Sequence, residues 1–441
     1  MTTTAPGSPY QSYVYAYPHK TAYRPLPDRP ELAGLWRDEK QDALSLYLHV
    51  PFCEVRCGFC NLFTRIGSPE GLTTAYLDAL ERQAGQVREA LSADARFALA
   101  AFGGGTPTYL TAAELERLCD IAEHRMGADL RSIPLSVEAS PDTATADRLR
   151  VLAERGTTRL SLGVQSFLDE EARSAVRPQK RAAVEAALGR VRDAGFPVLN
   201  IDLIYGIDGQ TAASWIESLD AALAWRPEEL YLYPLYVRPL TGLGRHGDGT
   251  PSPEWDAQRL ALYRAGRDHL LANGYQQVSM RMFRRAGAAS ASAGEYACQT
   301  DGMVGLGCGA RSYTSKLHYS FDYAVDAREV RRIIDDFVAA PDFSRAELGW
   351  EMTGDETRRR HLVQSLLQGE GVDLAAYRER FGSTPERDFP AELAEFAARG
   401  WLADDPDRLL LTPEGLAWSD AIGPRLFSAG VRARMAEYSP K

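Results

Sequence analysis

The stretch LYLHVPFCEVRCGFCNLF, Leu46 to Phe63, holds three of the six cysteines of this 441-residue chain. Cys53, Cys57 and Cys60 follow an apolar run that is typical of a buried strand. Thiolates so spaced in a tight loop can converge on one metal centre, and soft sulfur suits iron–sulfur clusters or zinc. A structural zinc site needs a fourth ligand, for which His49 is the nearest candidate. The residues alone leave three hypotheses open: a three-thiolate cluster, a zinc site, or three cysteines packed as small apolar side chains.

Short apolar or β-branched runs alternate with segments of helical period from Leu46 to Val237. The runs cover residues 46–50, 97–104, 134–140, 159–167, 197–206 and 229–237. In the segment after the cysteines, apolar residues recur every three or four positions, as one buried helix face requires: Leu77, Leu80, Ala84, Val87 and Leu91. Repeated strand–helix units with strands that look buried on both faces indicate a parallel sheet. The sequence therefore predicts an α/β fold with a partial (β/α)6 TIM-type barrel, which we prefer to an open doubly wound sheet.

The remaining chain divides by composition. The predicted parts are an aromatic-rich N-terminal extension (1–44), the barrel core (45–240), a barrel extension in the substrate region (241–350) and a small, mostly helical, winged-helix-like C-terminal domain (351–441). The extension carries tyrosines at every second or third position over 10–17 and either covers the pocket or packs under the barrel. Within 241–350 we expect a helix over 254–273 and a strand over 275–283. The stretch LADDPDRLLL, 402–411, places acids where a DNA-binding wing would meet phosphate, which favours a packing or lid role.

Composition narrows the class of protein. A net charge of −10 and a pI near 5.4 argue against a broad surface for nucleic acid or anionic lipid and favour a small-molecule substrate. The first forty residues lack the apolar core of a secretory signal, and no window is apolar enough to span a membrane. We therefore expect a cytoplasmic protein, a monomer or weak dimer, whose cysteines are free thiols or metal ligands.

The cysteine loop also carries a recognisable motif, Y-x-H-x-P-F-C-x3-C-x-F-C. It is spelled by Tyr47, His49, Pro51, Phe52, Cys53, Cys57, Phe59 and Cys60. This motif resembles the radical S-adenosylmethionine (SAM) enzymes, specifically the branch of oxygen-independent coproporphyrinogen III oxidases. The resemblance implies a [4Fe-4S] cluster on the three thiolates, with SAM bound to the fourth iron. It also implies a flavodoxin- or ferredoxin-type electron donor, reductive cleavage of SAM, and a 5′-deoxyadenosyl radical that abstracts hydrogen from the substrate.

The same resemblance assigns further site residues. It implies catalytic roles for Tyr47 and Glu138 and cofactor contacts by the glycine-rich loop that follows the second strand. The implied cofactor-binding set is Tyr47, Phe59, Gly103, Gly104, Gly105, Thr106, Glu138, Gln165, Arg177 and Asp202. Most of these follow strands, where such barrels place their ligands.

Two departures bear on the reaction. Leu62 stands where authentic coproporphyrinogen oxidases of this type carry another cysteine, and the His-Asn-x-x-Tyr-Trp signature typical of the haem-chaperone branch is absent. Some relatives use a second SAM as methyl or methylene donor, so we predict C-methylation or cyclopropanation of a small molecule. Porphyrinogen decarboxylation and haem binding stay as alternatives. Predicted pocket residues are Arg238, Arg281, Tyr296, Gln299 and Arg311, with Tyr313 as a wall, while Cys298 and Cys308 are expected to be buried free thiols.

Overall fold

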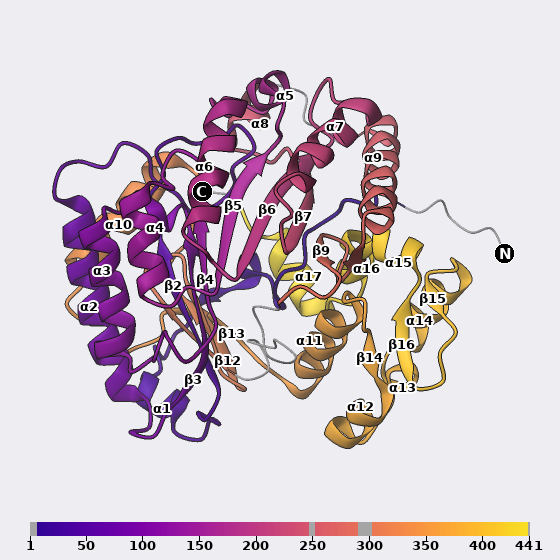
Figure 1. The fold of residues 1–441 in the computed structure, drawn as a ribbon. Coiled ribbons are helices and arrows are strands. Elements are labelled where there is room, and N and C mark those ends of the chain that lie inside the picture. The colour runs from indigo at the N-terminus through magenta and orange to yellow at the C-terminus, as the bar shows by residue number, and fades with distance from the viewer. Residues whose placement is uncertain (1–6, 247–251, 290–301, 440–441) are drawn as a thin grey trace.

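A large sheet forms the centre of the computed structural model, which describes residues 7–246, 252–289 and 302–439 (Figure 1). Its six central strands lie side by side in chain order, and each pairs in parallel with the next. They are β2 (Leu44–Val50), β3 (Phe97–Gly104), β4 (Leu135–Ala139), β5 (Arg159–Gln165), β6 (Val198–Tyr205) and β7 (Glu229–Pro234). Each begins within two residues of its predicted run, which confirms the six-unit α/β fold.

Helices cover one face of these strands. They are α2 (Leu72–Ala90), α3 (Ala112–Asp120), α4 (Ala146–Glu154), α5 (Asp169–Ser174), α6 (Arg181–Asp193) and α7 (Ala212–Leu223), with short helical turns η2 (Pro107–Tyr109) and η3 (Ile121–Arg125). In α2 the predicted apolar stripe, for example Leu77, Leu80 and Ala84, is buried in the main core. Figure 1 shows α2, α3 and α4 stacked beside the strands. Alternate residues of β2, Leu46, Leu48 and Val50, are fully buried in the same core.

The opposite face of the strands, here called the inner face, is polar. Successive strand side chains point to opposite faces, so a strand can bury one set and present the other. The inner-face set is Ser45, Tyr47, His49, Ser136, Glu138, Arg159, Ser161, Asn200, Asp202, Glu229, Tyr231 and Tyr233. Several inner-face side chains, such as Asn200 and Glu229, are buried as expected, but they are polar, which the apolar runs did not predict. The reason is that the inner face surrounds a site and not a second layer of helices.

Further strands extend both edges of the sheet, which stays open. On the side of β2, β10 (Met303–Leu306) pairs in parallel with β2, and the strands that follow are β11 (Arg311–Tyr313), β12 (Leu317–Ser320), β13 (Leu348–Glu351) and β1 (Arg24–Pro25). On the side of β7 the added strands are β9 (Met282–Arg285) and then β8 (Tyr275–Gln277). The single strand predicted over 275–283 is thus the antiparallel pair β8 and β9, because the chain turns at 278–281. The remaining helices here are α8 (Gly242–His246), α9 (Pro253–Ala272) and α10 (Ala327–Ala339), and α9 confirms the helix predicted over 254–273.

The C-terminal part has a small core of its own. It contains helices α11 (Gly354–Leu366), α12 (Leu374–Phe381), α13 (Pro385–Asp388), α14 (Pro390–Ala398), α15 (Pro413–Ala417), α16 (Ser419–Arg425) and α17 (Ala429–Ala436), and strands β14 (Val372–Asp373), β15 (Leu402–Ala403) and β16 (Arg408–Leu411). The three strands form a separate sheet, and buried residues such as Leu362, Tyr377 and Phe396 pack together there. The four domain boundaries stay predictions.

The N-terminal chain runs between the main sheet and this C-terminal part, where Figure 1 draws it in indigo past β7 and β9. It holds only the short turn η1 (Lys20–Ala22), β1 and α1 (Leu32–Trp36). Ser12 N–H donates to Asp420 O at 3.1 Å, and Val14 packs against the C-terminal core. The extended segment therefore joins two parts of the molecule that are far apart in sequence.

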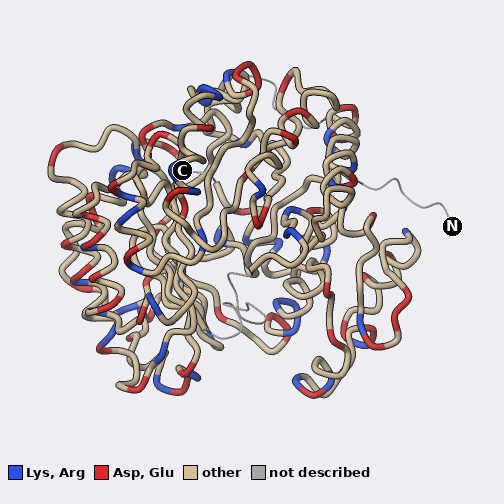
Figure 2. Tube along the Cα trace, viewed as in Figure 1, with Lys and Arg blue, Asp and Glu red and all other residues tan. Residues whose placement is uncertain are grey.

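Charged residues of both signs are interspersed along the helices in the view of Figure 2. Among the described residues, we find no helix with the length and apolar character needed to cross a bilayer.

Candidate functional site

The three cysteines lie in the loop that leaves β2. Two backbone hydrogen bonds close the base of this loop, since Cys53 N–H donates to Arg65 O at 3.0 Å and Arg65 N–H donates to Pro51 O at 2.7 Å. A turn in which Cys60 N–H donates to Cys57 O at 3.0 Å brings the last two thiols back toward the strand. The loop thus holds all three thiols at the carboxyl end of the parallel sheet, where α/β folds bind ligands.

Each sulfur has a polar neighbour. Cys53 Sγ lies 3.4 Å from Thr106 Oγ1, and Cys57 Sγ accepts a hydrogen bond from Arg177 Nη1 at 3.1 Å. Cys60 Sγ lies 3.9 Å from the hydroxyl of a threonine in its own loop. Donors beside thiolate sulfurs tune metal clusters, so this surrounding suits metal-bound sulfur.

The spacing of the thiols distinguishes a cluster from zinc. Zinc at about 2.3 Å from each thiolate in a tetrahedral site keeps the sulfurs about 3.8 Å apart. Within the described ranges, Asp120, Glu123 and His124 form the only group of His, Cys, Asp or Glu ligand atoms that all lie within 4.8 Å of one another. At least one pair of the three sulfurs is therefore more than 4.8 Å apart, which is wider than a zinc site requires and fits a cluster with a separate iron for each thiolate.

His49 is not placed as a zinc ligand either. Its Nδ1 lies 3.1 Å from Tyr47 Oη and its Nε2 lies 3.4 Å from Phe63 O. Both ring nitrogens therefore already have partners inside the protein.

The protonation of the thiols argues against a free nucleophile in this loop. Burial raises the pKa of Cys53 to about 12, and burial likewise raises the pKa of Cys60. Such thiols hold their protons at neutral pH unless a metal displaces them. The loop is therefore unsuited to supply a free thiolate nucleophile.

The glycine-rich loop passes close to the cysteines. A Cβ atom on Gly105 would lie 2.6 Å from Phe52 O and 3.0 Å from Cys53 Sγ. A Cβ atom on Gly104, whose φ is +118°, would lie 2.6 Å from the ring of His49. Only glycine allows the backbone this approach, so the predicted loop does lie against the predicted metal ligands.

Glu138 lies beside the same loop. Its Oε2 accepts a hydrogen bond from Gly104 N–H at 3.0 Å, and its carboxyl group lies 3.0–3.2 Å from the position of a Cβ on Gly103. The residue is exposed, yet protein surrounds it and burial raises the pKa of its carboxyl group to about 7. Glu138 therefore faces an accessible space inside the fold. Tyr47, also partly exposed and surrounded, lies on the same face of the sheet.

Asp202 and Gln165 lie on neighbouring strands. Asp202 accepts hydrogen bonds from Asn200 Nδ2 at 2.7 Å and from Ser161 Oγ at 3.1 Å, and burial raises the pKa of its carboxyl group. Asp202 on β6 pairs with Gly163 on β5. Gln165 follows Gly163 by two residues on the same strand and has a φ of +71°. Both side chains are partly exposed, so they remain accessible to a ligand.

Arg177 and Phe59 have partners within the protein. Besides Cys57, the Arg177 guanidinium donates to Gly163 O at 2.5 Å and to Gln179 Oε1 at 2.6 Å. Phe59 packs against a small apolar cluster at the ends of β6 and β7. The structure thus places Arg177 at the cysteine loop, and its role in binding the cofactor stays a prediction.

The predicted substrate arginines differ from one another. Arg281 binds Asp420 of α16 through both terminal nitrogens, one at 3.0 Å, and the two side chains are only 5% and 2% exposed. Arg311 donates to Tyr15 Oη at 3.1 Å, whereas Arg238 stacks at 4.5 Å on a tyrosine ring. Arg281 is therefore engaged in an ion pair that links the barrel to the C-terminal part.

Tyr296, Gln299 and Cys298 lie outside the described residues. Tyr313 is 2% exposed, and its ring centroid lies 4.5 Å from that of a histidine on β12. Cys308 is a buried free thiol, as expected.

Comparisons with known proteins agree with this geometry. The family model described as Radical SAM superfamily matches residues 47–222, and the HemN C-terminal domain matches residues 352–418. The chain belongs to the radical SAM superfamily. Within this superfamily it is of the HemN/HemW type.

Individual relatives point to the same type. The haem chaperone HemW of Bacillus subtilis is 28% identical over 84% of this chain and 96% of its own, and the oxygen-independent coproporphyrinogen III oxidase of Cereibacter sphaeroides is 29% identical over 78% and 77%. The structure of HemN from Escherichia coli, a coproporphyrinogen III oxidase, superimposes with a TM-score of 0.79 at 25% identity, covering 94% of this chain and 97% of that one. The cofactors of this radical SAM protein are accordingly a [4Fe-4S] cluster and SAM.

The sequence did not predict that side chains of the N-terminal segment lie within the site of this radical SAM protein. The ring of Tyr13 lies 6.2 Å from Tyr233 at the end of β7, and Arg281 lies 3.8 Å above it. Lys20 Nζ lies 3.2 Å from the ring centroid of Tyr323. The spacing of the tyrosines indicated an N-terminal segment that covers the pocket or packs under the barrel. It did not indicate which residues the segment contacts.

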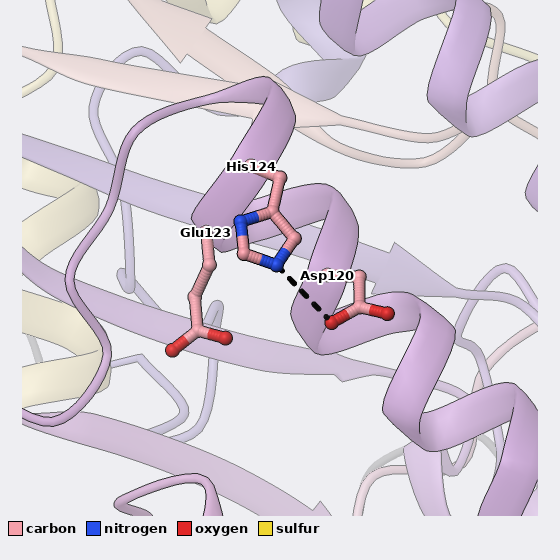
Figure 3. Close-up of side chains that lie close together, drawn as sticks. All are labelled: Asp120, Glu123 and His124. Atoms are coloured by element: carbon pink, nitrogen blue, oxygen red, sulfur yellow. Dashed lines mark ion pairs between the residues drawn. The ribbon is translucent and has the colours of Figure 1, made fainter.

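A second group of possible metal ligands lies on the helical side of the sheet (Figure 3). Asp120 ends α3, and Glu123 and His124 follow in η3, with His124 Nε2 3.6 Å from Asp120 Oδ1. Arg155 already binds both carboxylates, at 2.8 Å and 2.6 Å. This group is therefore explained as an ion-pair network between helices.

Proposed function

We propose that this protein cleaves SAM reductively and oxidises a tetrapyrrole-type small molecule. The observation that carries the proposal is the loop of Cys53, Cys57 and Cys60 at the carboxyl ends of the strands, open to a polar inner face. The named activities of the relatives, coproporphyrinogen oxidation and haem handling, favour this class of substrate over the C-methylation or cyclopropanation predicted from the sequence.

The cluster and SAM, when bound, supply a one-electron cleavage that yields methionine and a 5′-deoxyadenosyl radical able to abstract hydrogen. The protein's own residues bind and orient. The cysteines would hold iron, and the tight backbone at Gly104 and Gly105 together with Glu138 would position the methionine end of SAM. Asp202 and Gln165 offer acceptor oxygens for ribose hydroxyl groups.

The inner face also protects the reaction. The N-terminal segment lies over the end of β7, as the 6.2 Å between the ring centroids of Tyr13 and Tyr233 illustrates. Exclusion of water and oxygen is what a radical of this kind requires from the protein.

The first experiment tests the cluster. The triple variant Cys53→Ala, Cys57→Ala, Cys60→Ala should lose the brown colour after anaerobic reconstitution and form no 5′-deoxyadenosine with SAM and dithionite. The matched control, Cys119→Ala and Cys308→Ala, removes two buried free thiols outside this loop and should keep both properties. Normal SAM cleavage by the triple variant would contradict the proposal.

A second experiment separates the possible activities. Oxidation of coproporphyrinogen III should consume SAM and release 5′-deoxyadenosine without S-adenosylhomocysteine, whereas methyl or methylene transfer should release both. The extensive match to the haem chaperone makes haem binding the second candidate. Tight haem binding with no SAM consumption would replace the oxidase proposal with that role. The electron donor, of flavodoxin or ferredoxin type, stays a prediction.

A further inference from the structure

The N-terminal segment brings cationic side chains into the site without acidic partners. None of the ion pairs among the described residues involves Lys20, Arg311 or Arg238. By contrast, the buried guanidinium groups of Arg281 and Arg259 each bind a carboxylate. Charged groups that are taken out of water are normally paired with an opposite charge. It is therefore unusual that Lys20, Arg311 and Arg238 have no acidic partner among the described residues.

Lys20 lies directly beside the cysteine loop. Its Nζ lies over the ring of Tyr323 at 3.2 Å from the centroid, and Tyr323 Oη donates to Asn61 O at 2.6 Å, one residue after Cys60. Among the described residues the ammonium group thus has an aromatic face beside it and makes no ion pair with a carboxylate. Burial lowers the pKa of Lys20 well below its usual value, and neighbouring Arg311 lowers it further, so the position is unfavourable for an isolated cation.

Arg311 approaches the same place from β11. Its Nη1 donates to Tyr15 Oη at 3.1 Å, and its guanidinium lies 4.7 Å from the centroid of that ring. The ring of Tyr15 lies 5.7 Å from the ring of His19, the residue before Lys20. One N-terminal turn thus places Lys20 and His19 next to an arginine of β11, which lies two strands from β2 in the sheet.

His19 adds a neutral donor. Its Nδ1 accepts from Thr21 N–H at 3.3 Å and lies 2.8 Å from Thr21 Oγ1. A neutral imidazole whose Nδ1 accepts carries its proton on Nε2. Burial, together with the charges of Lys20 and Arg311, lowers the pKa of His19 to about 3, so the ring is neutral at physiological pH.

We propose that Lys20, His19 and Arg311 form a binding site for an anionic group of the substrate, a carboxylate or a phosphate, next to the cysteine loop. The inference rests on the proposed function for the identity of the ligand as the radical's substrate. The ammonium, the guanidinium and the Nε2–H group are all donors, and an anion among them relieves the repulsion between the two cations. The site would hold the substrate by its acidic group at a fixed distance from the cluster.

The test uses binding to the reconstituted full-length protein, because binding does not depend on turnover. Lys20→Met and Arg311→Met should each weaken coproporphyrin III and citrate about 10-fold or more, the loss of one charge-assisted contact. Neither variant should alter affinity for SAM or for the methyl ester of coproporphyrin III, in which the carboxylates are capped. Lys316→Met is the matched control, since Lys316 is exposed and pairs with Asp38 at 3.2 Å. Lys20→Arg should restore most of the binding.

Each other outcome decides the matter. Unchanged citrate and coproporphyrin III affinity in both Met variants overturns the site, as does wild-type protein that binds neither ligand. Weakened SAM binding instead assigns the cations to the cofactor carboxylate and also overturns it. Citrate binding that depends on Lys20 and Arg311, without any coproporphyrin III binding, supports the anion site and rejects the tetrapyrrole proposal. Circular dichroism of each variant shows whether it folds, and Arg311→Gln, which also removes the charge, replaces Arg311→Met if that variant does not.

Discussion

Replacing Asp420 by asparagine should destabilise the protein strongly, because it leaves a buried positive charge without its partner. Arg281 and Asp420 are 5% and 2% exposed, and the guanidinium faces the carboxylate with both terminal nitrogens. Tyr236 Oη donates to the same carboxylate, and the ring of Tyr13 covers the guanidinium at 3.8 Å. Little water reaches either charge, so solvent cannot replace the lost partner.

The magnitude follows from this burial. Removing one member of a buried pair typically costs about 3–5 kcal/mol, whereas the net value of the intact pair against apolar side chains is small. We therefore expect Asp420→Asn to lower the free energy of unfolding by about 3–5 kcal/mol. The double variant Arg281→Met with Asp420→Asn should be more stable than Asp420→Asn alone, because it no longer contains an uncompensated charge.

Urea unfolding followed by tryptophan fluorescence measures these differences through the midpoint and the slope. Glu185→Gln is the control, since its pair with Arg181 is 42–44% exposed and is worth about 0.3–0.5 kcal/mol. A loss below about 1 kcal/mol for Asp420→Asn would refute the reasoning. Strict additivity of the two single substitutions in the double variant would refute it as well, because neighbours in one pair must couple.

Two further predictions concern the site. Gly104→Ala should lower the free energy of unfolding by about 1–3 kcal/mol because of the φ of +118° at this position, and by about 1–3 kcal/mol more because the added Cβ would clash with His49. Gly127 has a φ of +80° and open space around it, so Gly127→Ala should show the cost of backbone strain alone. Urea unfolding measures both losses. Burial raises the pKa of Glu138 from 4.5 to about 7, so the native state holds this proton more tightly and the carboxyl group ionises as the pH rises through 7. SAM affinity should therefore rise as the pH passes 7, because the carboxylate that forms can bind the SAM ammonium group. In calorimetric titrations Glu138→Gln should remove this dependence of SAM affinity on pH. The same pH dependence in the variant and in the wild-type protein would contradict the role of this group.

The strands and helices of the core could be predicted because local patterns carry them. Short apolar or β-branched runs mark the strands and period-3.6 repetition marks the helices, and α2 buries the predicted Leu77, Leu80 and Ala84. The resemblance to a known family grouped Tyr47, Glu138 and Asp202 in one site, but the apolar runs gave no sign that the whole inner face is polar. Only the register of neighbouring strands shows that such residues share one face.

The three cysteines proposed as cluster ligands could be singled out by their spacing, because all three lie in one loop. The cationic site could not, since Lys20 and Arg311 are separated by most of the chain and the pairing of β10 with β2 decides that they meet. Similarly, nothing local indicates that Arg281 has its partner at Asp420 in α16. Long-range pairing of charges depends on topology, which a pattern within one segment does not contain.

The position of the N-terminal segment implies that the site is complete only when both ends of the chain are in place. Tyr17 Oη donates to Glu356 of α11, and Ser12 binds the backbone of Asp420, so the C-terminal part holds the segment from outside. From the same segment, Lys20 reaches toward the cysteine loop. A cation held by contacts on either side cannot withdraw to water when the site is empty. The side chain is therefore placed before an anionic ligand arrives, and such preorganisation lowers the cost of binding.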